Sequence, residues 1–356
     1  MKSFFNIQAG RSVFNALRKQ RGLTLVELMI AMTIGLLLLG GITSIMISSR
    51  QTYRVNEALS RMQDNARFAF QVLSRDIRMA GYFGCVGSDV TPTNTLNGPT
   101  DFLWNFKQTI YGYEATSATA WNLTPDSSIT SPLGGRDIIV VRGASGDGTS
   151  APVKVLDHPG GTPPGSANLK VSDASGLKES DVVMVTDCLG AAVFQITGCC
   201  AGTPGFDNVI HNTGSPSIVP GNLTKELGKE YTGGEVLKIT TRSYYIRTND
   251  AGRPALYRKV GTADVEEVVE GIENMQIQYG EDTNGDITAD IYRGADAVAD
   301  WSKVVSVRVS LLMQTIDDNI AGATQPYTFN GGTTTPTDRR LRQVYSTVIT
   351  LRNRAP

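Results

Sequence analysis

Histidine is almost absent from this 356-residue sequence, which contains two, His158 and His211. Both lie near stretches rich in proline or glycine, a poor setting for a histidine-based catalytic set or a histidine-rich metal site. The GxSxG, HExxH and P-loop motifs are missing, and no two cysteines are spaced as CxxC. These absences argue against hydrolase, metalloprotease, nucleotide-binding and zinc or thioredoxin-type chemistry. The sequence therefore predicts a non-enzymatic protein that needs no cofactor.

An excess of positive charge is also lacking, because 33 Lys and Arg residues face 34 Asp and Glu residues for a net charge of −1. The basic residues are unevenly spread, and residues 1–22 contain no acidic residue. That segment carries Lys2, Arg11, Arg18, Lys19 and Arg21. The remainder of the chain is acidic on balance, which argues against direct binding to nucleic acid.

Residues 23–47 form an apolar run whose single charge is Glu27. A membrane-spanning helix needs about 20 such residues, and the basic flank predicts a cytoplasmic N-terminus. A small residue, Gly22, precedes the run, whereas a secretory signal places its cleavage site after the apolar core. Cleavage after Gly22 would keep the apolar helix and make Leu23 the new N-terminal residue. Its free amine would then be a natural partner for the Glu27 carboxylate, which is costly alone in lipid.

The stretch "RGLTLVELMI", residues 21–30, resembles the type IV pilin family, which includes the pseudopilins of type II secretion. The resemblance implies that prepilin peptidase removes a leader, residues 1–22, by cutting after Gly22. It also implies methylation of Leu23, where the family more often has Phe. The retained helix would anchor the subunit in the lipid of the bacterial inner membrane and later pack in a filament core. Glu27 would be the acid that guides assembly.

The apolar pattern continues beyond the membrane segment, from residue 48 to residue 80. Apolar side chains recur there at intervals of three and four, which predicts an amphipathic continuation of the helix. They are Val55, Leu59, Met62, Ala66, Ala69, Leu73, Ile77 and Ala80. Six arginines lie largely off this stripe: Arg50, Arg54, Arg61, Arg67, Arg75 and Arg78. Gly81 is the expected end of the helix.

Residues 81–356 contain short β-type runs between turn signals, which predicts an antiparallel β-rich domain. The predicted strands are 137–142, 181–186, 192–197, 235–247, 255–259, 275–279, 304–312 and 343–352. Segments rich in glycine and proline predict loops at 143–168, 201–221 and 321–338. Asp282-Thr283-Asn284-Gly285-Asp286 begins like a calcium-binding loop, but the pattern then fails, and Asn-Gly favours a hairpin turn.

Several later segments resemble the PilW family of type IV pilus minor pilins. They are "MAGYFGC" (79–85), "YGYEA" (111–115), "DCLGAAVFQIT" (187–197), "ALYRKV" (255–260), "VEGIENMQIQYGEDTNGD" (269–286), "ADAVADWSKVVSVRVSLL" (295–312) and "STVITLRNR" (346–354). The resemblance implies an α+β pilin fold, a lollipop in which a long N-terminal helix is packed on a periplasmic β-rich domain.

The family resemblance also implies a function and partners. The subunit would join other minor pilins in a priming complex at the inner membrane, start assembly of the major pilin, and end near the pilus tip with a PilY-type adhesin. It would support twitching motility and adhesion. The alternative is a minor pseudopilin of a type II secretion system, which would share the fold but serve another machine.

The four cysteines predict disulfides in an oxidising compartment, because their number is even and the chain carries an export signal. They are Cys85, Cys188, Cys199 and Cys200. We favour a bond between Cys85 and Cys188, which would tie the helix end to the sheet and leave a vicinal pair or two free thiols. The alternative joins Cys188 to Cys199 or Cys200, and Cys85 to the other cysteine.

Overall fold

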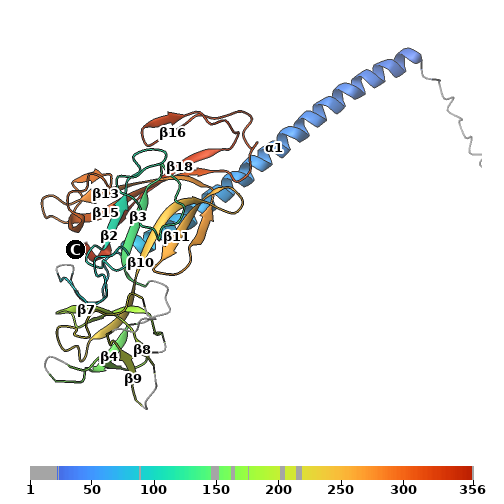
Figure 1. Ribbon diagram of the computed structural model, residues 1–356. Coiled ribbons are helices and arrows are strands. Elements are labelled where there is room, and N and C mark those ends of the chain that lie inside the picture. Colours follow the sequence, from blue (N-terminus) through green and yellow to red (C-terminus); the bar gives the residue numbers. More distant parts are fainter. Residues whose placement is uncertain are drawn as a thin grey trace, which may run out of the picture. The chain divides into compact units, whose positions relative to one another are not determined.

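The computed structural model describes residues 22, 24–87, 90–145, 152–161, 165–174, 176–200, 205–213 and 219–354 (Figure 1). The predicted leader, apart from Gly22, and the predicted new N-terminal residue Leu23 lie outside this described part. The chain divides into two compact units, Met1–Arg54 and Val55–Pro356. The second unit therefore includes helical residues as well as the β-rich domain.

One helix, α1 (Leu25–Arg78), covers nearly all of the predicted apolar and amphipathic segment, residues 23–80. It ends two residues before Ala80, the expected last residue. The amide of Ala80 bonds to the carbonyl of Ile77 in a tighter turn, at 3.1 Å. Gly81 has a φ of +73°, and its amide donates to the Arg142 carbonyl at 2.8 Å. The glycine is needed because this left-handed conformation turns the chain from the helix toward a strand.

A large β-rich domain follows the helix, and its strands pair almost entirely antiparallel. The strands are β1 (Thr93–Asn94), β2 (Ile110–Tyr113), β3 (Ile138–Ala144), β4 (Val153–Asp157), β5 (Asn168–Val171), β6 (Val182–Thr186), β7 (Ala191–Gln195), β8 (Gly198–Cys199), β9 (Asp207–Ile210), β10 (Glu235–Thr248), β11 (Pro254–Val260), β12 (Glu266–Glu270), β13 (Ile272–Glu281), β14 (Ile291–Arg293), β15 (Val304–Gln314), β16 (Tyr327–Phe329), β17 (Gly332–Thr334) and β18 (Arg342–Thr350), with 3-10 turns η1 (Trp301–Lys303) and η2 (Arg352–Arg354). The pair β1–β7 is parallel. The predicted α+β class is confirmed.

Each of the eight predicted strands has a counterpart, but the three predicted loops also contain short strands. The strand β4 lies in the first of them, β9 in the second, and the hairpin β16–β17 in the third. These strands have only three to five residues and are flanked by glycine and proline, so composition alone does not predict them. In β4 the side chains of Val153 and Val155 are buried while that of Lys154 is exposed, which is the alternation of a strand.

The helical residues of the second unit pack into a core that is shared by a four-stranded sheet, with the order β14-β13-β15-β18, and by β3, β10 and β11 of the larger, twelve-stranded sheet. Six residues of the predicted stripe are buried here: Met62, Ala66, Ala69, Leu73, Ile77 and Ala80. All six arginines predicted to lie off the stripe are exposed. From the four-stranded sheet, residues such as Met275, Val309 and Ile349 contribute to this core. The periodicity of the sequence therefore identified the face that the helix buries.

The longest strand, β10, belongs to two groups of strands. Its first residues pair with β4 and β6, and its later residues pair with β3 and β11. The part of the chain between β3 and β10, residues 152–236 and here called the insert lobe, has its own hydrophobic core, to which Val155, Phe194 and Tyr231 contribute. Figure 1 shows four strands of the insert lobe, β4, β7, β8 and β9, gathered at the lower end of the view.

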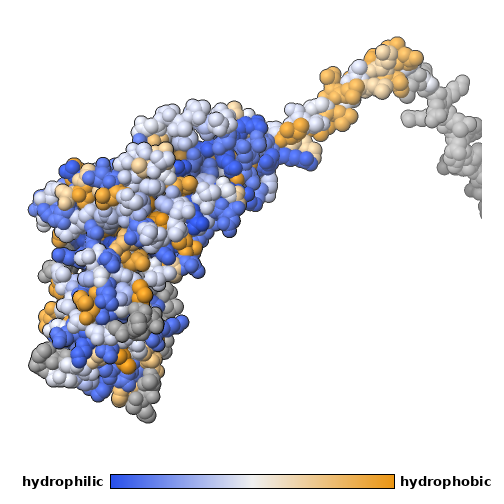
Figure 2. All heavy atoms as spheres, viewed as in Figure 1, coloured by the Kyte–Doolittle hydropathy of each residue, from blue (hydrophilic) through white to orange (hydrophobic). Residues whose placement is uncertain are grey.

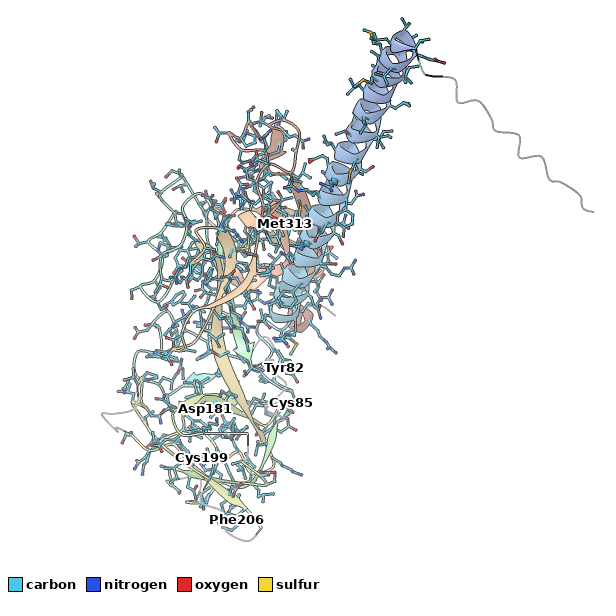
Figure 3. The ribbon with its side chains drawn as sticks, turned by 90° about the vertical axis from the view of Figure 1, so that its right-hand side faces the viewer. Tyr82, Cys85, Asp181, Cys199, Phe206 and Met313 are labelled. Carbon is cyan, nitrogen blue, oxygen red and sulfur yellow. A yellow bond between two sulfur atoms is a disulfide. The ribbon has the colours of Figure 1, made fainter. Side chains whose placement is uncertain are left out.

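A disulfide connects the segment after α1 with the turn between β6 and β7. Cys85 and Cys188 are joined, with Cα atoms 4.9 Å apart, as favoured on the sequence. In Figure 3, Cys85 lies between Tyr82, just past the helix end, and Cys199 in β8. Cys199 and Cys200 are joined as a vicinal pair, with Cα atoms 3.7 Å apart. The Cys85–Cys188 bond thus fastens the insert lobe to the chain that leaves the helix.

Candidate functional site

The start of α1 carries two of the residues singled out in the sequence, Gly22 and Glu27, and both are exposed. Thr24 is the residue that starts the helix. Its carbonyl accepts the first helical bond, from the Leu28 amide at 3.1 Å, and its Oγ1 accepts from the Glu27 amide at 3.2 Å. Thr24 Oγ1 also lies 3.5 Å from Glu27 Oε2. Thr24 is therefore an N-cap with Glu27 as its third helical residue.

Sequence reasoning missed this role of Thr24, although its signal was present. The segment Thr24-Leu25-Val26-Glu27 has the T-x-x-E form of a capping box just before an apolar run. A carboxylate in the first turn is also favoured by the helix dipole. Glu27 thus has a local role in stabilising the start of the helix, in addition to the charge pairing expected at a free N-terminus.

Within the described part of the chain, the apolar part of α1 buries none of its side chains. Among the described residues, α1 is the one helix long and apolar enough to cross a membrane. Figure 2 shows this segment as a run of apolar residues. The hydroxyls of Thr33 and Thr43 donate to carbonyls within the helix, at 3.0 Å to Met29 and 2.8 Å to Leu39. These polar groups are thereby satisfied without water, as lipid requires.

A buried charge cluster joins the later part of α1 to β10 and β11. Asp76 is 3% exposed. Its Oδ2 accepts from the Tyr244 hydroxyl at 2.5 Å and lies 3.4 Å from Nε of Arg242 and 3.8 Å from a guanidinium nitrogen of Arg258. Burial, together with the Asp76 carboxylate, raises the pKa of Tyr244. The sequence held a signal for this cluster, because Asp76 stands on the apolar stripe between Leu73 and Ile77.

The two histidines meet in the insert lobe, where both are buried. Their ring centroids are 6.0 Å apart, and Phe194 and Tyr231 pack beside them. Within the described part of the chain, no partner lies in hydrogen-bonding geometry at either ring nitrogen of His211. Burial and the neighbouring His158 lower the pKa of His211 to about 4. Within the described residues, no group of three or more His, Cys, Asp or Glu side chains is placed to hold a metal ion.

The acidic loop at residues 282–290 closes the hairpin between β13 and β14, in agreement with the predicted turn. The Asp282 carboxylate accepts from the amides of Asn284, Gly285 and Ile287, at 3.1, 2.6 and 2.8 Å. These backbone bonds, the one from Gly285 foremost, hold the pKa of Asp282 below its usual range. The loop is thus ordered by its own backbone bonds, which accounts for its aspartates as turn residues.

Comparisons with known proteins agree with the helix motif and the β-rich domain in pointing to a type IV pilin-like protein. Residues 17–43 match the prokaryotic N-terminal methylation motif, and residues 243–353 match the family described as type IV pilus-assembly protein W, PilW. The second match runs from within β10 to η2. Together the two matches confirm the resemblance to type IV pilins and to PilW.

Other comparisons add less. A type IV-like pilin from Thermus thermophilus is a similar solved structure, with 13% identity, a TM-score of 0.33, and coverage of 83% of this chain and 99% of that chain. That similarity is too low to carry an argument. No curated protein matches the sequence. The segments 79–85, 111–115 and 187–197, which contributed to the sequence resemblance, lie outside the two matched ranges.

Proposed function

We propose that this chain is a minor pilin of the type IV pilus, a non-enzymatic subunit that enters an inner-membrane priming complex and starts filament assembly. The observation that carries the proposal is the pairing, in one chain, of the N-methylation motif with the PilW match across the four-stranded sheet. Under this proposal the subunit ends near the pilus tip and supports twitching motility and adhesion.

The structure supports an assembly role through the exposed apolar part of α1. At least ten large apolar side chains between Leu25 and Ile47 are more than half exposed, for example Leu25 at 75% and Leu37 at 77%. Such a surface is not stable in water and must be covered by lipid or by other helices. The proposed coverings are inner-membrane lipid before assembly and the helices of the major and minor pilins afterwards. The globular part would then lie in the periplasm.

Processing at Gly22 is part of the same proposal. Gly22, the residue before the proposed cut, is exposed. Gly22→Val should leave a full-length precursor, because the peptidase of the pilin family cuts after a glycine. Immunoblotting of membranes would show the longer band, and a band of mature size in this variant would contradict processing at Gly22.

The decisive experiment is affinity purification of the full chain from detergent-solubilised membranes of its host, with bound proteins identified by mass spectrometry. Minor pilins and a PilY-type adhesin should be recovered if the proposal is right. Recovery of type II secretion pseudopilins in their place would support the alternative machine. Recovery of neither set would overturn both assignments.

A further inference from the structure

One edge of the four-stranded sheet is long, regular and unpaired. The strand β18 has nine residues and pairs with β15 in an unbroken register, and no other strand of the described chain pairs with it. The Leu351 amide donates to the Val305 carbonyl at 2.9 Å, and the Thr315 amide to the Leu341 carbonyl at 3.0 Å. Since bonded and non-bonded pairs alternate in an antiparallel ladder, the backbone groups of Val344, Ser346, Val348 and Thr350 face away from β15.

The residues with outward backbone groups form what we call the β18 edge: Val344, Ser346, Val348 and Thr350. The side chains of Val344 and Val348 are 40% and 48% exposed. From residue 343 to residue 351 the sequence, "QVYSTVITL", has no charge and no proline. Edge strands of stable monomers are usually protected by charges, proline or bulges. The β18 edge has none of these protections.

Another sheet margin, the five-residue strand β12, shows the contrast. Among the described strands, β12 pairs with β11 alone, so it is also an edge. Three of its five residues are glutamates, Glu266, Glu267 and Glu270, and its register with β11 is broken between Leu256 and Tyr257. The same chain therefore protects one edge and leaves another open. An open edge presents a row of donors and acceptors that only another extended backbone can satisfy.

Positive charge lies at the C-terminal end of the β18 edge. A hollow of about 390 Å³ is lined there by Gln71, Ser74, Met79 and three arginines, Arg75, Arg78 and Arg352, with no acidic side chain among its lining residues. All three arginines are exposed. A segment that pairs with β18 and continues past Thr350 would meet this hollow. An acidic residue in that segment would be attracted to it.

We propose that the β18 edge is the docking site for an extended segment of a neighbouring pilin subunit, which adds a strand to the sheet. The segment places apolar side chains against Val344 and Val348 and an acidic side chain toward Arg78 and Arg352. This inference rests on the proposed function, because subunits of a growing filament meet through unlike surfaces. Pairing of two copies through β18 would instead close a dimer and stop growth.

A photoreactive benzoylphenylalanine placed at Ser346 in the full chain tests the contact in host membranes. The matched control position is Thr262, which is exposed and lies in the turn between β11 and β12 of the other sheet. We expect an adduct from position 346 alone, whose second chain carries an N-methylation motif of its own. Equal adducts from both positions, no adduct from 346, or an adduct with a second copy of this chain would overturn the proposal.

Val348→Pro tests the backbone bonds themselves, since it removes an outward amide and spares the bonds to β15. The adduct should fall about tenfold, as expected when edge pairing is blocked. Val348→Lys is the second variant should the proline impair folding, judged by protease resistance. Arg352→Glu should also weaken the adduct, and Arg67→Glu, which lies outside the hollow, should not.

The two levels of proposal fail in different ways. Wild-type chain that purifies without any pilin would remove the proposed function. Chain that purifies with pilins but keeps its full adduct in the Val348 variants would leave that function standing and refute the β18 edge as the docking site.

Discussion

Glu27 has two physical roles that substitutions can separate. It is the third residue of a helix capped by Thr24, and it is the single charge in the apolar run. Gln at this position can still serve a capping box, but it carries no charge. A loss of charge and a loss of capping therefore predict different results.

We expect Glu27→Gln to remain in the membrane and to enter pili poorly, because the pairing with the amine at Leu23 is lost. Thr24→Ala should cost the helix about 1 kcal/mol and leave incorporation near normal. Immunoblotting of sheared pili and membranes measures both. Normal incorporation of Glu27→Gln together with failure of Thr24→Ala would show that capping, not charge, is the role of Glu27.

His211 makes the stability of the insert lobe depend on pH. Its pKa is lowered to about 4, by burial first and then by His158, whereas an unfolded histidine titrates near 6.5. Between these values the unfolded chain binds more protons, so stability is present above pH 6.5 and is lost as the pH falls toward 4. The shift corresponds to about 3 kcal/mol. Burial also lowers the pKa of His158, and the carboxylates of Glu230 and Asp157 oppose part of that shift.

Replacing His211 with Leu should remove this dependence. The free energy of unfolding of the detergent-solubilised chain, measured in urea at pH 7.5 and at pH 4.5, should fall less in the variant, by about 2–3 kcal/mol. Asp137 changes the free energy of unfolding with pH in the opposite direction, in the wild type and in the His211 variant alike. Burial and the nearby Glu114 raise its pKa to about 7, so its contribution is lost as the pH rises. Parallel pH profiles would contradict the assignment to His211.

At the scale of elements, α1 changes its surroundings along its length. Its first part exposes apolar side chains on all sides, and its later part buries a single stripe in a core formed by β13, β15 and β18 together with β3, β10 and β11. Asp76 adds polar bonds to that packing, because Tyr244 and Arg242 come from β10 and Arg258 comes from β11. Because hydrogen bonds are directional, this cluster restricts the rotation of the helix relative to β10 and β11 more narrowly than apolar contacts do.

Asp76→Ala should destabilise the second unit by about 3–5 kcal/mol, because Arg242 and Tyr244 would be left buried without their acceptor. Asp64→Ala is the matched control, since Asp64 is an exposed acid on the same helix. Its expected effect is below about 0.5 kcal/mol. Thermal unfolding followed by circular dichroism compares the two, and equal effects would contradict the role of the cluster.

For the molecule as a whole, the Cys85–Cys188 bond links two parts of the second unit across a separation of 103 residues. The chain-entropy argument gives such a bond about 4–5 kcal/mol, through restriction of the unfolded chain. The bond also suits the periplasmic location that is proposed for this domain.

Cys85→Ser, Cys188→Ser and the double variant should each lose about 4–5 kcal/mol, and the double variant should lose no more than either single one. Urea unfolding under non-reducing conditions measures these values, with wild-type protein in reducing agent as a further comparison. Additive losses would show that the two cysteines act separately and would contradict the bond.

The sequence by itself determined the features that depend on local pattern. The apolar run, the stripe from Met62 to Ala80 and the eight predicted strands follow from side-chain periodicity, which reflects burial on a regular backbone. The proposed leader, Gly22 and Glu27 were equally visible, because the proposed processing motif is a contiguous stretch of chain. Thr24 was visible too, in its T-x-x-E pattern, and went unrecognised.

Tertiary structure alone decided what depends on residues distant in the chain. Asp76 meets Tyr244 across 168 positions, the two histidines come together in one core, and one of three disulfide pairings is selected. The sequence also does not predict which strands lie unpaired at a sheet edge, because the composition of β18 fits a central strand as well as an edge strand. Local propensity does not specify such contacts, because they form only when the whole core brings separate strands and helix faces together.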